Sequence, residues 1–238
     1  LHRKAFQAYR QALVPDQRHV MTLINLGAAH FESGDFDKAL ETYRATERLD
    51  PDNPKLWANE GLALAALGRD EEAAAAFRKA VRLDPGDIDT YLKLGRHLDR
   101  FGRPDEAIEV YRLITRQKPL HYAANFQLGR SHARAERWDQ SAEAFLRAME
   151  ARPEAPAAYL ALGRVELLSG RPQEALAVFS AVLRLDADNV QAHRGILLSY
   201  LQAGKREAAR QHLEDLKMNS PAVGRELSDL DPAEGDRP

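Results

Sequence analysis

Small, aromatic and apolar residues recur along the chain every 34 residues, with no insertion or deletion between the first five units. The register is set by the glycines Gly27, Gly61, Gly95, Gly129 and Gly163. Twelve residues after each glycine comes a small residue, at Ala39, Ala73, Ala107, Ser141 and Ala175, and four residues later an aromatic one, at Tyr43, Phe77, Tyr111, Phe145 and Phe179. A fixed period of this length is typical of a protein built from stacked copies of one helical unit.

Each unit is predicted to form two antiparallel helices. Tyr91 and Leu94 lie three residues apart before a register glycine, as do equivalent residues in other units, so they share the buried face of a first helix. A second glycine column ends this helix, because glycine accepts the left-handed conformation of a helix C-terminus. Its members are Gly34, Gly68, Gly102, Gly170 and Gly204, with Glu136 in the fourth unit. The second helix is expected to end before a proline, which cannot continue it, at Pro51, Pro85, Pro119 and Pro153.

These columns resemble the tetratricopeptide repeat pattern W-x2-L-G-x2-Y, then A-x3-F, then P over 34 residues. The tyrosine expected after the glycine is poorly kept, as with His30, His132 and Glu166. The resemblance implies an all-α, right-handed superhelical solenoid of antiparallel helix pairs, with about six and a half units.

The register predicts where each unit lies. Residues 1–19 are expected to form the second helix of a truncated repeat, followed by five repeats, a degenerate sixth, a short capping helix and a frayed tail. The repeats span 20–53, 54–87, 88–121, 122–155 and 156–189, with the sixth over 190–223, the cap over 224–231 and the tail over 232–238. The lone second helix at the start and the absence of an initial Met predict that native sequence precedes Leu1, and that another segment, copy or protein covers the apolar face of this helix.

Charge and composition narrow the class of function. The 238 residues include 34 Lys and Arg against 36 Asp and Glu, a net charge of −2. Such a balance gives no field that favours nucleic acid or an anionic membrane, and no apolar run approaches a membrane span, so neither is expected as a partner. The absence of cysteine excludes disulfides and thiolate chemistry and leaves cytoplasm and periplasm open. No cofactor, metal or catalytic motif is expected, because the scattered histidines have no chelating spacing.

The candidate site is the concave wall that the first helices would line. Its basic positions are Lys93, Arg96, Arg130, Arg134, Arg164 and Arg194, interleaved with Leu92, Phe126, Leu160 and Leu167. Arg96, Arg130 and Arg164 repeat at 34 residues and are predicted to stack as a ladder that binds an acidic peptide, a terminal carboxylate or a phosphorylated segment. The alternative is a solvated surface, because 26 of the 34 basic residues are Arg and Asp89 and Asp99 lie nearby.

Two subfamilies offer further comparisons. The Lys and Asn clamp of chaperone-binding members is absent, because the position after each register glycine holds no Asn. The array of O-linked N-acetylglucosamine transferases is similar in having Asn two residues before the glycine, and Asn25 and Asn59 fit this pattern. The resemblance therefore also implies that these two side chains hold the backbone of a bound peptide.

The function that these observations favour is a non-catalytic protein-interaction scaffold with a partner segment in the concave groove. Two alternatives remain: the substrate-recognition array of a larger enzyme, and an anchored assembly factor of a bacterial envelope complex. The acidic C-terminal residues, among them Asp229, Asp231, Glu234 and Asp236, are predicted to fold back onto basic first-helix positions and compete with the partner.

Overall fold

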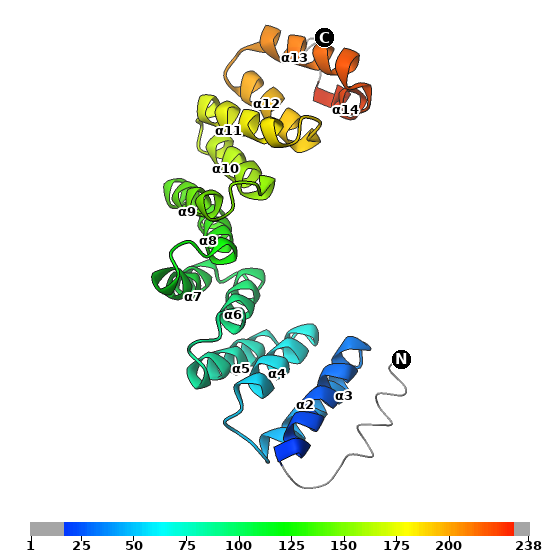
Figure 1. Ribbon diagram of the computed structural model, residues 1–238, viewed down its shortest axis with the longest axis vertical. Coiled ribbons are helices and arrows are strands. Elements are labelled where there is room, and N and C mark those ends of the chain that lie inside the picture. The colour runs from blue at the N-terminus through cyan, green and yellow to red at the C-terminus, as the bar shows by residue number, and fades with distance from the viewer. Residues whose placement is uncertain (1–16, 231–238) are drawn as a thin grey trace. The chain divides into compact units, whose positions relative to one another are not determined.

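The computed structural model describes residues 17–230, and the tail predicted over 232–238 lies outside them. So does most of the helix predicted over 1–19, although α2 already begins at Gln17. The described residues contain α-helices and one short 3-10 turn but no strand (Figure 1). They divide within α7, between Tyr111 and Arg112, into two compact units. None of their helices is both long enough and apolar enough to cross a bilayer.

Unit 1 alternates first and second helices as the glycine register predicts. The first helices are α2 (Gln17–Glu32), α4 (Pro54–Ala66) and α6 (Ile88–Arg100), and the second helices are α3 (Phe36–Glu47), α5 (Asp70–Leu83) and the start of α7 (Pro104–Gln117). The rings of Tyr43, Phe77 and Tyr111 are almost fully buried. Each ring lies against the register glycine of its own pair, where any Cβ would overlap it. The glycine and aromatic columns therefore pack against each other and hold the two helices together.

Unit 2 contains three further pairs and a C-terminal cap. Its first helices are α8 (Tyr122–Arg134), α10 (Pro156–Leu168) and α12 (Val190–Gln202), and its second helices are α9 (Trp138–Ala151), α11 (Pro172–Leu185) and α13 (Arg206–Asn219). The aromatic column continues with buried Phe145 and Phe179, and Ser141 donates a hydrogen bond to the carbonyl of Gly129 at 2.7 Å. Successive pairs share apolar clusters, so each repeat buries its faces against its neighbours.

The C-terminal cap differs in its bounds from the helix predicted over 224–231. Helix α14 (Pro221–Glu226) begins earlier, and the 3-10 turn η1 (Ser228–Leu230) follows it. Pro221 explains the early start, because its fixed φ suits the first turn of a helix. Val223 and Leu227 pack on Leu213 and Leu216 of α13, so the cap closes the apolar face of the last pair.

The second glycine column takes the left-handed conformation that the sequence predicts. The φ angles of its five glycines lie between 71° and 82°. Glu136, in the same position after α8, has φ 54°, and it is the one non-glycine residue with positive φ among those described. The turn geometry is thus imposed by the helix pair and is kept even where the residue type opposes it.

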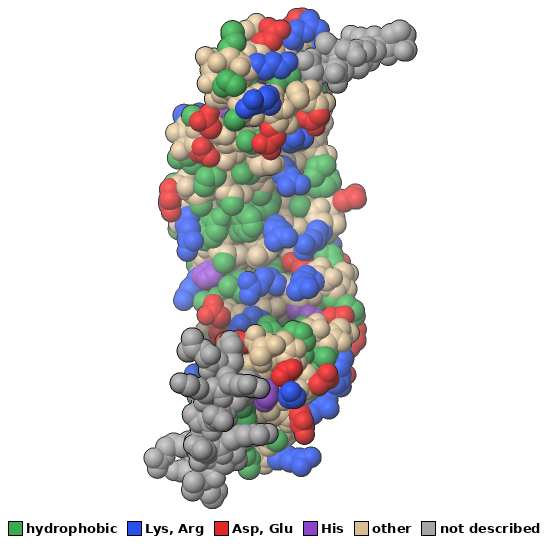
Figure 2. Space-filling model, turned by 90° about the vertical axis from the view of Figure 1, so that its right-hand side faces the viewer, with side chains coloured by type: hydrophobic (Ala, Val, Ile, Leu, Met, Phe, Trp, Pro, Cys, Tyr) green, Lys and Arg blue, Asp and Glu red, His purple; other side chains and the backbone are tan. Residues whose placement is uncertain are grey.

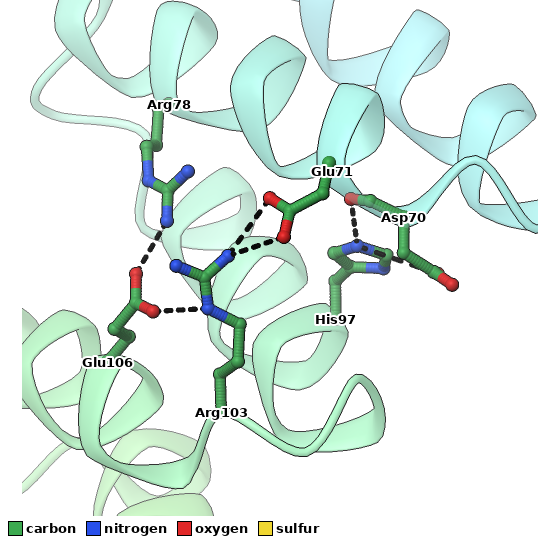
Figure 3. Close-up of polar contacts among 6 residues, drawn as sticks. All are labelled: Asp70, Glu71, Arg78, His97, Arg103 and Glu106. Atoms are coloured by element: carbon green, nitrogen blue, oxygen red, sulfur yellow. Dashed lines mark hydrogen bonds and ion pairs between the residues drawn. The ribbon is translucent and has the colours of Figure 1, made fainter.

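Arginines recur in the turns between the paired helices, and two of them, Arg103 and Arg171, link consecutive repeats. Arg103 donates from Nη1 to Glu71 Oε2 of the preceding repeat at 3.0 Å and pairs with Glu106 of its own helix (Figure 3). Arg78 donates to the other oxygen of Glu106 at 2.6 Å. In unit 2, Arg171 repeats the arrangement with Asp139 at 2.8 Å. The equivalent Arg69 pairs with Glu72 at 2.6 Å, and we call Arg69, Arg103 and Arg171 the turn arginines.

Candidate functional site

The first helices of unit 2 enclose three neighbouring hollows, which together we call the first-helix groove. One hollow, of about 470 Å³, lies between α8 and α10. Its wall includes five of the predicted site residues, namely Phe126, Arg130, Arg134, Leu160 and Arg164. The structure therefore gathers these five side chains, which come from two repeats, around one cavity.

Two further hollows lie between α10 and α12. The first, of about 310 Å³, is lined by Leu160, Arg164 and Arg194, with the ring of Phe179 beneath. That ring is buried between Gly163 and Gly195, where a Cβ on either glycine would come within 2.6 Å of its carbons. The second hollow, of about 620 Å³, is walled by leucines and by Arg164. Arg164 thus lines all three hollows.

The other predicted site residues lie in unit 1. Lys93 and Arg96 are on α6, where Arg96 is exposed and Lys93 is half-buried. Asn25 is exposed on α2, and Asn59 is half-buried on α4. The three-membered arginine ladder is therefore divided between the units, with Arg130 and Arg164 together in unit 2. The sixth repeat has Leu198 at the ladder position and carries Arg194 one helical turn earlier.

Charge on the first helices of unit 2 is strongly one-sided. Helices α8, α10 and α12 carry Arg130, Arg134, Arg164 and Arg194 and a single carboxylate, Glu166. Glu166 is buried and accepts a hydrogen bond from Arg171 Nε at 2.5 Å, which raises the pKa of that guanidinium. Helix α6 of unit 1 differs, because Asp89 and Asp99 accompany its basic residues. The excess of positive charge on first helices is therefore a property of unit 2.

The groove arginines differ from one another in their partners. Arg130 Nη1 donates to Gln127 Oε1 at 3.2 Å, which leaves its charge uncompensated by that contact. Arg194 Nη1 lies 3.4 Å from Asp229 Oδ2 of the C-terminal cap. Arg164 is exposed and has no hydrogen bond or ion pair with any residue of the described chain, 17–230. By contrast, all three turn arginines have carboxylate partners.

Exposed apolar side chains lie beside these arginines. Leu168 is 66% exposed and Leu198 is 39% exposed, although both are large aliphatic residues. Phe126 is half-buried. Its ring stacks on that of Tyr122, with 5.8 Å between the ring centroids, and lies edge-on to that of Phe145, with 5.6 Å between the centroids. Figure 2 shows one face of the molecule on which a patch of hydrophobic side chains has Lys and Arg side chains beside it. A surface of this composition can hold a segment that is both acidic and apolar.

A buried histidine pair is the main polar feature that sequence reasoning missed. His193 Nδ1 lies 3.1 Å from His212 Nε2, and His193 Nε2 lies 2.9 Å from the carbonyl oxygen of Ala187. Burial and the neighbouring His193 lower the pKa of His212. The two residues are 19 positions apart on α12 and α13, a spacing that no chelating motif has. Within the described residues no group of three or more His, Asp or Glu is arranged to hold a metal ion.

Comparison with known families identifies the repeat. A family profile described as tetratricopeptide repeat matches residues 24–88, 92–156 and 126–190. A second profile with the same description matches residues 166–227. A search of curated protein sequences gave no match.

Several solved structures share the fold. MamA from Desulfovibrio magneticus RS-1 is 22% identical, with 71% of this chain and 96% of that one covered and a TM-score of 0.63. YrrB, described as a TPR protein with an unusual peptide-binding site, is 20% identical, with 78% and 95% covered and a TM-score of 0.64. PilW, described as a type IV pilus biogenesis factor, is 20% identical, with 87% and 96% covered and a TM-score of 0.64. At this level of identity the likeness concerns the fold.

Proposed function

The chain belongs to the tetratricopeptide repeat family, and from this premise we propose that it is a non-catalytic protein-interaction scaffold whose first-helix groove holds an acidic segment of a partner protein. Arg130, Arg164 and Arg194 contact the carboxylates of that segment, while Phe126 and Leu160 contact its apolar side chains. The peptide-binding site named for YrrB belongs to a protein of the same fold.

The observation that carries this proposal is the state of Arg164. Arginine is abundant in this chain, so the exposure of an arginine does not by itself indicate a binding site. Each of the three turn arginines, by contrast, pairs with a carboxylate of this chain. Arg164 lacks such a carboxylate within residues 17–230 and lies at the junction of three hollows. A guanidinium in that position is available for a carboxylate from outside.

The C-terminal cap of this chain already places a carboxylate beside one arginine of the first-helix groove. Asp229 of η1 reaches Arg194 of α12 at 3.4 Å, so one groove arginine already contacts a carboxylate. A partner segment would extend the same pairing to Arg164 and Arg130. Lys93, Arg96, Asn25 and Asn59 of unit 1 form a separate part of the proposal, with Lys93 and Arg96 binding carboxylates and the two asparagines binding backbone.

Selection from a displayed library of random peptides tests the proposal. The library is applied to the wild-type chain, to an Arg130→Glu and Arg164→Glu double variant, and to Arg184→Glu, whose exposed residue on α11 is the matched control. We expect acidic peptides to be enriched on the wild type and on the control and to be lost on the double variant, with helical circular dichroism unchanged in all three. Peptides without net negative charge, or equal enrichment on all three proteins, would refute the role of the groove arginines.

The unit 1 residues are tested separately. We use two variants, Arg96→Glu and the double variant Asn25→Ala with Asn59→Ala. Their affinities for the selected peptides are measured by fluorescence anisotropy. Weaker binding by either variant would extend the binding surface into unit 1, whereas unchanged affinity would confine it to unit 2. The alternative in which the array selects substrates for a larger enzyme predicts a catalytic domain encoded in the same gene, which reading that gene would reveal.

A further inference from the structure

The hollow between the C-terminal halves of α10 and α12 is the most apolar part of the first-helix groove. Its wall is formed by Leu167 and Leu168 of α10 and by Leu198 and Leu201 of α12, together with Arg164 and Gln202. We call this cavity, which is walled mainly by the four leucines, the leucine hollow. Its volume of about 620 Å³ is sufficient for a large aliphatic side chain.

The two helices that form the walls of the leucine hollow are fixed by contacts with each other and with the core. Gln202 Nε2 donates to the carbonyl oxygen of Leu167 at 3.0 Å, which joins the C-terminal ends of α12 and α10. Leu167 packs on the apolar cluster around Phe179, and Leu201 packs on the cluster beneath the cap. The hollow is therefore bounded by anchored helices, so a ligand would find it already formed.

The two other leucines remain in contact with solvent. Leu168 and Leu198 are 66% and 39% exposed, and they lie on facing helices. Solvent exposure of neighbouring aliphatic side chains is unfavourable, and removing their area from water would stabilise a complex. Each of these residues also lines a second hollow that Arg164 borders. Leu168 lines the hollow between α8 and α10, and Leu198 lines the smaller hollow between α10 and α12.

Charge and apolar surface meet at Arg164. This residue borders the leucine hollow, and its guanidinium has no acidic partner within residues 17–230. A ligand with only apolar side chains would leave that charge partly desolvated and unpaired, which is costly. A ligand with only carboxylates would leave the leucines in water. A segment that carries both groups satisfies both parts of the surface.

We infer that the groove selects partner segments in which an acidic residue lies next to a large aliphatic residue. The carboxylate pairs with Arg164 while the aliphatic side chain enters the leucine hollow. This inference rests on the proposed function, because it specifies the partner segment bound by that same groove. It requires both features in one segment, so acidity alone gives only weak binding.

A double-mutant cycle on a selected peptide tests the inference. The wild type is compared with a Leu168→Gln and Leu198→Gln variant, and the peptide with a version whose aliphatic residue is replaced by alanine. Leu146→Gln with Leu185→Gln is the control, because these leucines are 53% and 49% exposed on second helices. Either change alone is expected to weaken binding by about tenfold or more, the effect of losing one buried apolar contact. Both changes together should weaken it little further.

The outcomes separate this inference from the proposed function. Acidic peptides that bind through Arg164 but show no aliphatic preference, and no response to the leucine variant, would overturn the inference alone. Absence of any acidic peptide binding would overturn both. Sedimentation of the free chain covers a further occupant: self-association that the leucine variant abolishes would assign the hollow to a second copy and refute the inference.

Discussion

Glu60 is a buried carboxylate at a position that is aliphatic in the other repeats, and replacing it is expected to stabilise unit 1. The other repeats have an aliphatic residue at its position, namely Leu26, Leu94, Leu128, Leu162 and Ile196. Glu60 is 5% exposed, and its Oε2 atom is buried without a hydrogen-bond partner in the described chain. Its nearest cation is Arg44, whose Nε lies 4.0 Å from Oε1. Burial of the ionised form is therefore only partly compensated.

The size of the effect follows from the pKa of Glu60. Burial, reinforced by the nearby Glu47, raises this pKa to about 7, although Arg44 acts in the opposite direction. The folded chain then binds a proton that the unfolded chain has already released. The free energy of unfolding therefore falls as pH rises from about 4.5 to about 7 and is constant above that, with a loss of roughly 3 kcal/mol in total.

Glu60→Gln removes the titration while keeping the shape of the side chain. Relative to wild type, we expect it to raise the free energy of unfolding by roughly 3 kcal/mol at about pH 8 and to change it little at about pH 4.5. Glu60→Leu, which restores the residue of most other repeats, should do the same with an added apolar gain.

Urea unfolding at several pH values measures this effect in unit 1 alone. The chain has two tryptophans, so a Trp138→Phe background leaves Trp57, three residues from Glu60 on α4, as the only tryptophan, whose fluorescence is excited selectively over that of tyrosine. The wild-type curves should shift to higher urea on acidification, and the Glu60→Gln curves should not. Equal pH slopes in both proteins, or a variant less stable than wild type at about pH 8, would refute the reasoning.

Other predictions concern the turn, the histidine pair, the turn arginines and the tail. Glu136→Gly should raise the free energy of unfolding by about 1 kcal/mol because it relieves a left-handed conformation, and an alanine there should give no gain by calorimetry. The lowered pKa of His212 favours its neutral form in the fold, so unit 2 should lose stability as pH falls below about 6.5, and His212→Gln should flatten that loss in fluorescence-monitored unfolding. Arg103→Gln should cost about 0.5–1 kcal/mol at low salt and less at high salt; no salt dependence would contradict an ionic link. Deleting residues 232–238 should tighten binding of acidic peptides at low salt, and unchanged anisotropy titrations would refute competition by the tail.

Several features of the fold could be predicted from the sequence because they depend on local conformation and on one repeated contact. In the first five pairs the glycine of the first helix packs against the aromatic residue of the second helix, so their spacing is fixed by the geometry of the pair. The positions of the turn glycines could be predicted because glycine accepts the left-handed conformation in which each first helix ends. The cap differed because Pro221 can start a helix, a signal that lies outside the repeat pattern.

The candidate site depends on which charges lie within reach of one another. Arg103 and Arg164 belong to two columns with the same 34-residue period, and the sequence alone treats them alike. The carboxylates 32 residues before Arg103 and Arg171, Glu71 and Asp139, were a readable signal for pairing, yet pairing requires the side chains of successive second helices to converge. The structure shows that they do, and that Arg164 points to hollows instead.

The family, the helix pairs and the set of first-helix residues follow from periodicity, because a solenoid is built from contacts between positions at a constant spacing. Three-dimensional packing, in contrast, sets which arginines have carboxylate partners, which leucines stay exposed and that His193 contacts His212. These depend on the directions of side chains from different repeats and on distances of a few ångströms, which periodicity does not encode.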